Sequence, residues 1–78
     1  MINELSNIIL EHDLPEIGLK TGDIGTVVMV HEGGVGYEIE FCELDGVTVD
    51  VVTLDASQIR AVRSGEVAYA RPLTERTS

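Results

Sequence analysis

The stretch VVMVHEGGVGYEIEF, residues 27–41, predicts a β-hairpin. Its second half, YEIEF, alternates between apolar residues and glutamates. Successive side chains of a strand point to opposite faces of a sheet, so this alternation is typical of a strand with one buried face. The Gly33-Gly34 pair fits a tight turn, because the central residues of such a turn need positive φ angles that glycine tolerates.

Outward from this hairpin, the chain predicts an all-β protein. Strands are expected at 7–12, 25–31, 36–43, 47–54 and 59–62, because apolar and β-branched runs there are bounded by turn-forming residues. The glycines of GLKTGDIGTVVMV (residues 18–30) are interpreted as a chain reversal into the second strand. DASQ, residues 55–58, is expected to form one helical turn before the last strand. This pattern resembles a small SH3-like five-stranded barrel.

The chain length of 78 residues allows one domain. We expect the SH3-like barrel to occupy residues 1–63. Residues 64–78 are polar towards their end, and they are expected to form either a C-terminal edge strand or a partly disordered tail.

Strand registers follow from the two hairpin turns. A two-residue Gly33-Gly34 turn places Val30 opposite Tyr37 and Val28 opposite Ile39, which leaves Val27 and Met29 on the other face. A three-residue loop at 44–46 is favoured for the second hairpin, since it pairs apolar residues with one another.

The loop at 44–46 would set Phe41 opposite Val49 and Ile39 opposite Val51. It also sets Glu40 opposite Asp50, which is an unfavourable pair of like charges.

The charge balance restricts the partners. Fourteen acidic and five basic residues give a formal net charge of −9. Nucleic acids and anionic membrane surfaces would be repelled, so neither is predicted as a partner. A basic protein has the complementary charge.

No catalytic, cofactor or metal site is predicted. A phosphate-binding loop needs GxxxxGK[ST] before a helix, whereas Gly25 leads into a strand. His12, His31 and Cys42 lack the spacing of a zinc site, and the predicted strand separates His31 from Cys42 by about 20 Å. The single cysteine excludes an intrachain disulfide. With neither a signal peptide nor a membrane-spanning segment recognised, a cytoplasmic, non-enzymatic protein is expected.

Three segments agree in order and spacing with a known family: DLPEIGLKTGDIGTVV (13–28), YEIEF (37–41) and VTLDASQIRAV (52–62). The chain thereby resembles a family of small bacterial and cyanobacterial proteins known only as a domain of unknown function. The resemblance implies an SH3-like fold, no known catalysis, and genes that can lie beside those of toxin-like proteins. An antitoxin-like or immunity-like role is suggested by this analogy.

The predicted interaction surface has an apolar centre and an anionic border, as protein interfaces often do. It comprises Val27, Met29, Glu38, Glu40, Thr48 and Asp50. We expect this surface to bind a basic protein, either as an inhibitor or as a docking module. The alternatives are a structural accessory subunit of a larger complex, a homodimer through the apolar face, or coverage of that face by the C-terminal tail.

Overall fold

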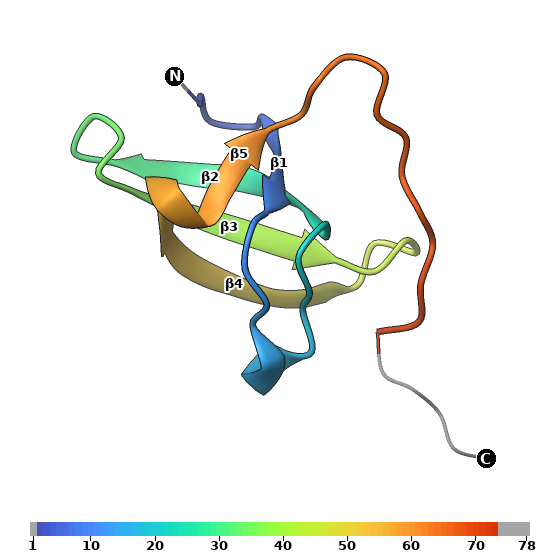
Figure 1. Ribbon diagram of the computed structural model, residues 1–78. Coiled ribbons are helices and arrows are strands. Elements are labelled where there is room, and N and C mark those ends of the chain that lie inside the picture. Colours follow the sequence, from blue (N-terminus) through green and yellow to red (C-terminus); the bar gives the residue numbers. More distant parts are fainter. Residues whose placement is uncertain (1, 74–78) are drawn as a thin grey trace.

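One antiparallel sheet of five strands organises the protein, and the computed structural model describes residues 2–73 of it (Figure 1). The strand order is β4-β3-β2-β1-β5. The strands are β1 (Asn7–Leu10), β2 (Ile24–His31), β3 (Gly36–Cys42), β4 (Thr48–Asp55) and β5 (Ile59–Ala61). The predicted all-β class with five strands is confirmed. The sheet is not closed, because β4 and β5 are its two edges and do not pair with each other.

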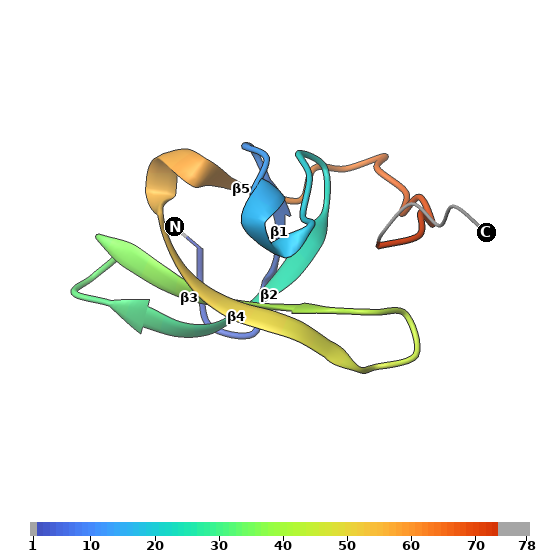
Figure 2. The same cartoon turned by 90° about the horizontal axis from the view of Figure 1, so that it is seen from below.

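The sheet folds over itself so that β1 and β5 lie above the layer formed by β2, β3 and β4 (Figure 2). Two short 3-10 turns accompany the strands: η1 (Pro15–Ile17) in the first loop and η2 (Ala56–Gln58) before β5. The predicted helical turn at η2 is confirmed. A reciprocal capping box stabilises it, in which Asp55 Oδ1 accepts from the backbone N–H of Ser57 at 2.9 Å and Gln58 Oε1 accepts from that of Asp55 at 3.0 Å.

The core lies between the two layers and draws on every strand. Its buried members are Ile8, Leu10, Leu19, Val27, Tyr37, Ile39, Phe41, Leu54 and Ile59. Gly25 passes directly over this core, because a Cβ atom there would lie 2.5 Å from Cγ2 of Ile39 and 2.9 Å from Cε1 of Phe41. This glycine is therefore required by close packing as well as by the chain reversal that the sequence predicted.

The first hairpin follows the predicted register only near its tip. The predicted two-residue turn at Gly33-Gly34 is wrong, because residues 32–35 form a longer loop in which the N–H groups of Gly34 and Val35 both donate to the carbonyl of His31. Val30 lies opposite Tyr37, as expected, but the register shifts between Val27 and Met29. Val27 therefore lies opposite Ile39 and is completely buried, whereas Val28 is 40 % exposed. The predicted pairing of Val28 with Ile39 is wrong, because a β-bulge moves the following residues to the other face.

The second hairpin also contains a register shift, here between Phe41 and Cys42. Its tip is the predicted three-residue loop, since the N–H of Glu43 bonds to the carbonyl of Val47 at 2.8 Å. Beyond the shift, however, the pairing differs from the prediction: Phe41 lies opposite Asp50, Ile39 opposite Val52 and Glu40 opposite Val51. The predicted Glu40–Asp50 pair of like charges is therefore wrong.

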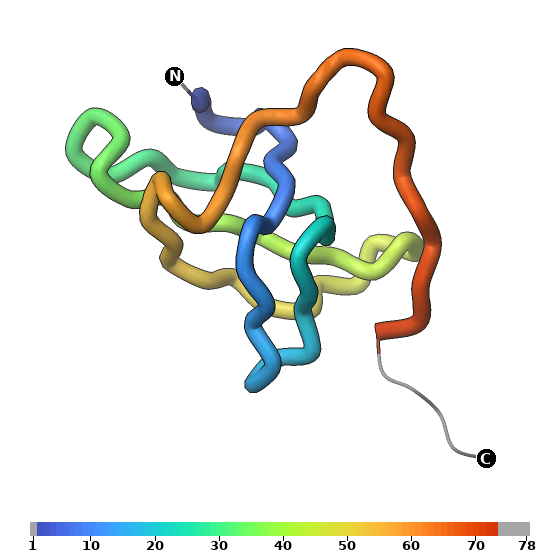
Figure 3. Tube along the Cα trace, in the orientation of Figure 1, coloured from blue at the N-terminus to red at the C-terminus, as the bar shows by residue number. Residues whose placement is uncertain are grey.

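Residues 64–73 form a C-terminal strap that runs clear of the sheet before returning to it (Figure 3). No strand occurs between Gly65 and Ala70, so the edge-strand alternative is wrong. The strap returns to the body at Arg71 and Leu73, and Leu73 packs against the core beside Gly18. The other alternative, a partly disordered tail, also concerns residues 74–78, which lie outside the described part of the chain.

Candidate protein interaction face

The outer surface of β2, β3 and β4 carries four of the six residues predicted to bind a partner. Within β3, the buried Tyr37, Ile39 and Phe41 alternate with Glu38 and Glu40, so the two glutamates point away from the core. Their cross-strand neighbours share this surface, which we call the acidic face. It comprises Met29, Glu38, Glu40, Thr48, Val51 and Thr53.

The other two predicted residues do not belong to the acidic face. Val27 is buried in the core because of the bulge in β2. Asp50 lies opposite the inward-facing Phe41, and its Oδ1 accepts a hydrogen bond from the backbone N–H of Val51 at 2.8 Å. Both errors have one origin, since a shift of one residue exchanges the two faces of a strand.

Glu38 is at the centre of a side-chain cluster that spans three strands. Its Oε2 accepts a hydrogen bond from Oγ1 of Thr53 at 2.7 Å and lies 2.8 Å from Nε2 of His31. These hydrogen bonds, that of His31 first and that of Thr53 second, hold the pKa of Glu38 below its usual value. Both contacts therefore favour the ionised form of Glu38.

Glu40 has a similar, simpler arrangement. Its Oε2 accepts a hydrogen bond from Oγ1 of Thr48 on the neighbouring strand at 2.7 Å. A threonine of β4 therefore orients each of the two glutamates of β3. Apolar side chains lie directly opposite them, with Met29 beside Glu38 and Val51 beside Glu40. The face thus combines oriented carboxylates with partly exposed apolar surface.

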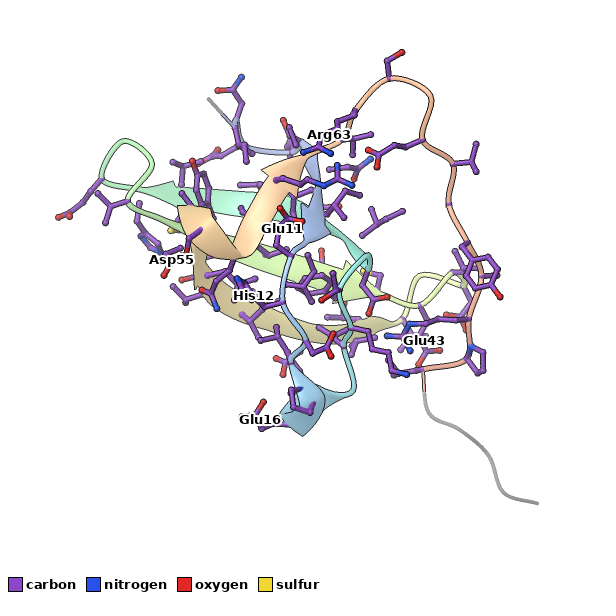
Figure 4. The ribbon with its side chains drawn as sticks, in the orientation of Figure 1. Glu11, His12, Glu16, Glu43, Asp55 and Arg63 are labelled. Atoms are coloured by element: carbon purple, nitrogen blue, oxygen red, sulfur yellow. The ribbon has the colours of Figure 1, made fainter. Side chains whose placement is uncertain are left out.

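Charge is distributed unevenly between the two layers of the fold. Residues 24–55, which contain β2, β3 and β4, include seven acidic residues and neither lysine nor arginine. These are Glu32, Glu38, Glu40, Glu43, Asp45, Asp50 and Asp55. Figure 4 shows Glu43 and Asp55 at opposite ends of the β3–β4 hairpin, so the negative charge extends over its whole length.

The basic residues of the described chain lie elsewhere, and two of the four are held in ion pairs. Arg60 binds Glu66, with Nη2 and Oε2 2.6 Å apart. Arg71 binds Asp23 in the loop before β2. In the alternative in which the C-terminal tail covers the predicted interaction surface, Arg71 was expected to fold back onto its acidic residues. This expectation is wrong, because Arg71 binds Asp23 instead. Among the described residues, no lysine or arginine forms an ion pair with a carboxylate of residues 24–55.

The residues considered for metal binding are not brought together. His31 is occupied with Glu38, and Cys42 lies at the other end of β3. Within residues 2–73, no group of three or more histidine, cysteine, aspartate or glutamate side chains is placed to hold a metal ion. Over the same range, no helix has the length and apolar character needed to cross a membrane.

His31, Val51 and Thr53 are members or neighbours of the acidic face that sequence reasoning missed. The missed signal is the alternation VVTLD at the end of β4, where Val52 and Leu54 turn inward. Because Val52 and Leu54 point inward, the alternating residues Val51 and Thr53 point outward, where they lie beside Glu40 and Glu38.

The open antiparallel sheet and its charged outer surface define a small all-β domain. A sequence profile described as Domain of unknown function (DUF4926) matches residues 4–61, which include all five strands. The chain belongs to this family, in agreement with the resemblance seen in its sequence. Neither a curated protein nor a solved structure gives a significant match.

Proposed function

We propose that this protein is a non-enzymatic interaction module whose acidic face docks a basic protein. The observation that carries the proposal is the presence of seven acidic residues, with neither lysine nor arginine, in residues 24–55, which comprise β2, β3, β4 and the two loops that join them. Complementary charge accelerates association and discriminates against partners of the wrong sign. A basic surface would also offset the mutual repulsion of these carboxylates.

The acidic face has the features that such docking needs. Glu38 and Glu40 are oriented by threonine hydroxyls, so less side-chain freedom is lost when an arginine or lysine of the partner binds them. Met29 and Val51 are about half exposed, at 49 % and 46 %, and they offer apolar surface next to the charges. An interface of this kind gains affinity from burial and specificity from its carboxylates.

The role that we assign is inhibition or positioning of the partner by steric coverage, as an antitoxin-like or immunity-like protein would act. This assignment rests on the analogy with family members whose genes can lie beside those of toxin-like proteins, and on the negative net charge of this chain. It requires neither a cofactor nor catalysis, and it places the protein in the cytoplasm with its partner.

A second candidate function is that of a structural subunit, or of a homodimer, held through the apolar part of the same face. Met29 and Val51 are the exposed apolar residues of this face that favour it. The two functions differ in their response to salt, because screening weakens contacts between exposed charges much more than apolar contacts.

The test is capture of a partner by the tagged protein from native lysate, followed by elution with salt. The double variant Glu38→Lys/Glu40→Lys should lose a basic protein that the wild type retains at low salt. Glu4→Lys/Glu16→Lys is the matched control, because it changes the charge equally at exposed positions outside residues 24–55. This control should still capture the partner.

Equal capture by the wild type and Glu38→Lys/Glu40→Lys would refute docking on the acidic face. If the wild type instead sediments as a dimer that resists high salt and dissociates in Met29→Asp, the second candidate function is the correct one. Circular dichroism of each variant confirms that its fold is retained.

A further inference from the structure

A groove of about 1190 Å³ lies between the C-terminal strap and the β3–β4 hairpin. The strap forms one wall, and the hairpin tip at residues 42–45 forms the opposite one. Figures 1 and 2 show the strap running apart from the sheet over this stretch. Small-molecule pockets usually enclose about 300–1,000 Å³, so the size of this groove favours a polypeptide segment as its occupant.

Apolar side chains from four parts of the fold line the groove. Ile24 begins β2, Leu44 lies at the hairpin tip, Val62 follows β5, and Val67 and Tyr69 belong to the strap. Val67 is 91 % exposed and Tyr69 is 89 % exposed. A concentration of exposed apolar side chains on a small protein marks an interaction site more often than chance exposure does.

The strap is fastened at both ends and unsupported between them. At its start, the backbone N–H of Arg63 donates to Glu66 Oε1 at 2.6 Å, and Glu66 also binds Arg60. At its end, Nη2 of Arg71 donates to the carbonyl of Gly18 at 3.1 Å. Among the described residues, the backbone groups of residues 67–70 make no hydrogen bonds. An extended chain can pair with such a backbone by adding a strand.

The charges around the groove indicate a basic occupant. Asp23 and Glu66 are neutralised by the arginines of the strap and β5. Glu43 and Asp45 on the hairpin wall have no ion-pair partner within residues 2–73. Among the basic residues that line the groove, Arg60 and Arg71 are in ion pairs and Lys20 is not, so two such acidic groups stand against one basic group. A lysine or arginine of the occupant would therefore face the hairpin wall.

We propose that this groove binds an extended, alternately apolar segment of the basic partner, with a lysine or arginine directed at Glu43 and Asp45. The identity of the partner rests on the proposed function, but the groove is a second surface, separate from the acidic face. The occupant pairs with the backbone of residues 67–70 and buries its apolar side chains against Ile24 and Val62. The partner would thus contact both sides of the β3–β4 hairpin, the acidic face on one side and the groove on the other.

Cys42 provides a direct reporter for this proposal, because it lines the groove, is exposed, and is the single cysteine of the chain. Random peptides displayed on phage are selected on the wild-type protein and counter-selected on Val62→Glu. Selected peptides should share alternating apolar residues and at least one lysine or arginine. At saturation, the synthetic peptide should slow alkylation of Cys42 by N-ethylmaleimide about fivefold or more, since a bound chain covers the groove wall.

Matched variants localise the binding. Val62→Glu and Tyr69→Ala should weaken peptide affinity about tenfold, because each removes apolar contact in the groove. Val35→Glu, the same substitution in the β2–β3 loop, should leave it unchanged. In Cys42→Ser/Val35→Cys, the relocated thiol should react equally fast with and without peptide. Since Tyr69 is almost fully exposed, Tyr69→Ala keeps the test valid even if Val62→Glu does not fold.

The proposal would be overturned by the absence of a shared peptide pattern, by a bound peptide that leaves Cys42 reactivity unchanged, or by a consensus without a cationic residue. Protection of Cys42 that rises with the concentration of the protein alone would also overturn it, because a second copy would then occupy the groove. Glu38→Lys/Glu40→Lys should bind the peptide like the wild type. Failure of docking on the acidic face is therefore distinguishable from failure of the groove.

Discussion

The guanidinium group of Arg71 binds the carboxylate of Asp23, which lies 48 residues earlier in the chain. Nε of Arg71 donates to Oδ1 at 2.9 Å, and Nη2 donates to Oδ2 and to the carbonyl of Gly18. Both side chains are about four-fifths buried. This contact fastens the end of the C-terminal strap to the loop that leads into β2, and it defines one end of the groove.

Removal of this contact should loosen the strap. Arg71→Ala leaves Asp23 without its partner, so we expect a loss of about 1–2 kcal/mol in the free energy of unfolding, measured with urea. Chymotrypsin should cleave after Tyr69 faster than in the wild type. Arg63→Ala is the control, since the guanidinium group of Arg63 makes no hydrogen bond among the described residues. Equal cleavage rates in Arg71→Ala and wild type would show that the strap is not held at this point.

Gly25 should not tolerate even one additional methyl group. In Gly25→Ala the new Cβ would meet Ile39 and Phe41 inside contact distance, so we expect destabilisation of about 1–3 kcal/mol in urea unfolding. Gly36→Ala is the matched control in the next strand, because its nearest neighbouring atom would be 3.8 Å away. That variant should remain within about 0.5 kcal/mol of the wild type. A neutral Gly25→Ala would mean that the strands are further apart than described.

The bulge in β2 is tested by two neighbouring valines. Val27→Ala removes fully buried methyl groups and should cost about 2 kcal/mol of unfolding free energy. Val28→Ala makes the same chemical change at an exposed position and should cost less than about 0.5 kcal/mol. A register without the bulge would bury Val28 in place of Val27 and predicts the reverse order of the two losses. The comparison therefore decides whether the bulge is present.

Glu66 should contribute to acid sensitivity. The side-chain hydrogen bond from Arg60, followed by that from the backbone of Arg63, lowers its pKa to about 2 from a usual value of 4.5. A carboxylate with a lowered folded-state pKa stabilises the fold above its unfolded pKa, and this contribution disappears as the pH falls through the folded value. The urea midpoint of the wild type should therefore decrease between about pH 4.5 and pH 2.

Glu66→Gln should flatten this pH dependence, because its amide cannot titrate. Glu16→Gln is the control, since no hydrogen bond to the Glu16 carboxylate occurs in the described chain. An unchanged slope in Glu66→Gln would show that other carboxylates account for the acid response. The lowered pKa values of Asp13, Glu38 and Asp55 contribute in the same direction and remain present in both variants.

Local patterns in the sequence were sufficient to predict the strands, the tip of the second hairpin and the turn at η2. The alternation in YEIEF and the capping residues of DASQ act over a few neighbouring residues, so they can be read without tertiary structure. The registers could not be read in this way. Whether Val27 or Val28 turns inward depends on the packing of β1 and β5 over β2, and a bulge satisfies that packing at the cost of regular pairing.

The same distinction applies to the candidate site. The outward orientation of Glu38 and Glu40 was predicted correctly, because these residues alternate with the buried residues of β3. Val27 and Asp50 were misplaced because each lies next to a register shift. The groove had no local signal at all, since it depends on the return of Arg71 to Asp23 across most of the chain.

The uneven distribution of charge between the layers has a consequence at distances beyond contact. Since seven acidic residues lie in β2–β4 and their connecting loops, and the described basic residues lie outside that range, the centres of negative and positive charge do not coincide. The protein therefore has an electric dipole in addition to its net charge. A cationic molecule that comes within roughly one Debye length, about 8 Å at physiological salt, exerts a torque on it. The protein then presents its β2–β4 layer before collision, and a larger fraction of encounters begins in the productive orientation.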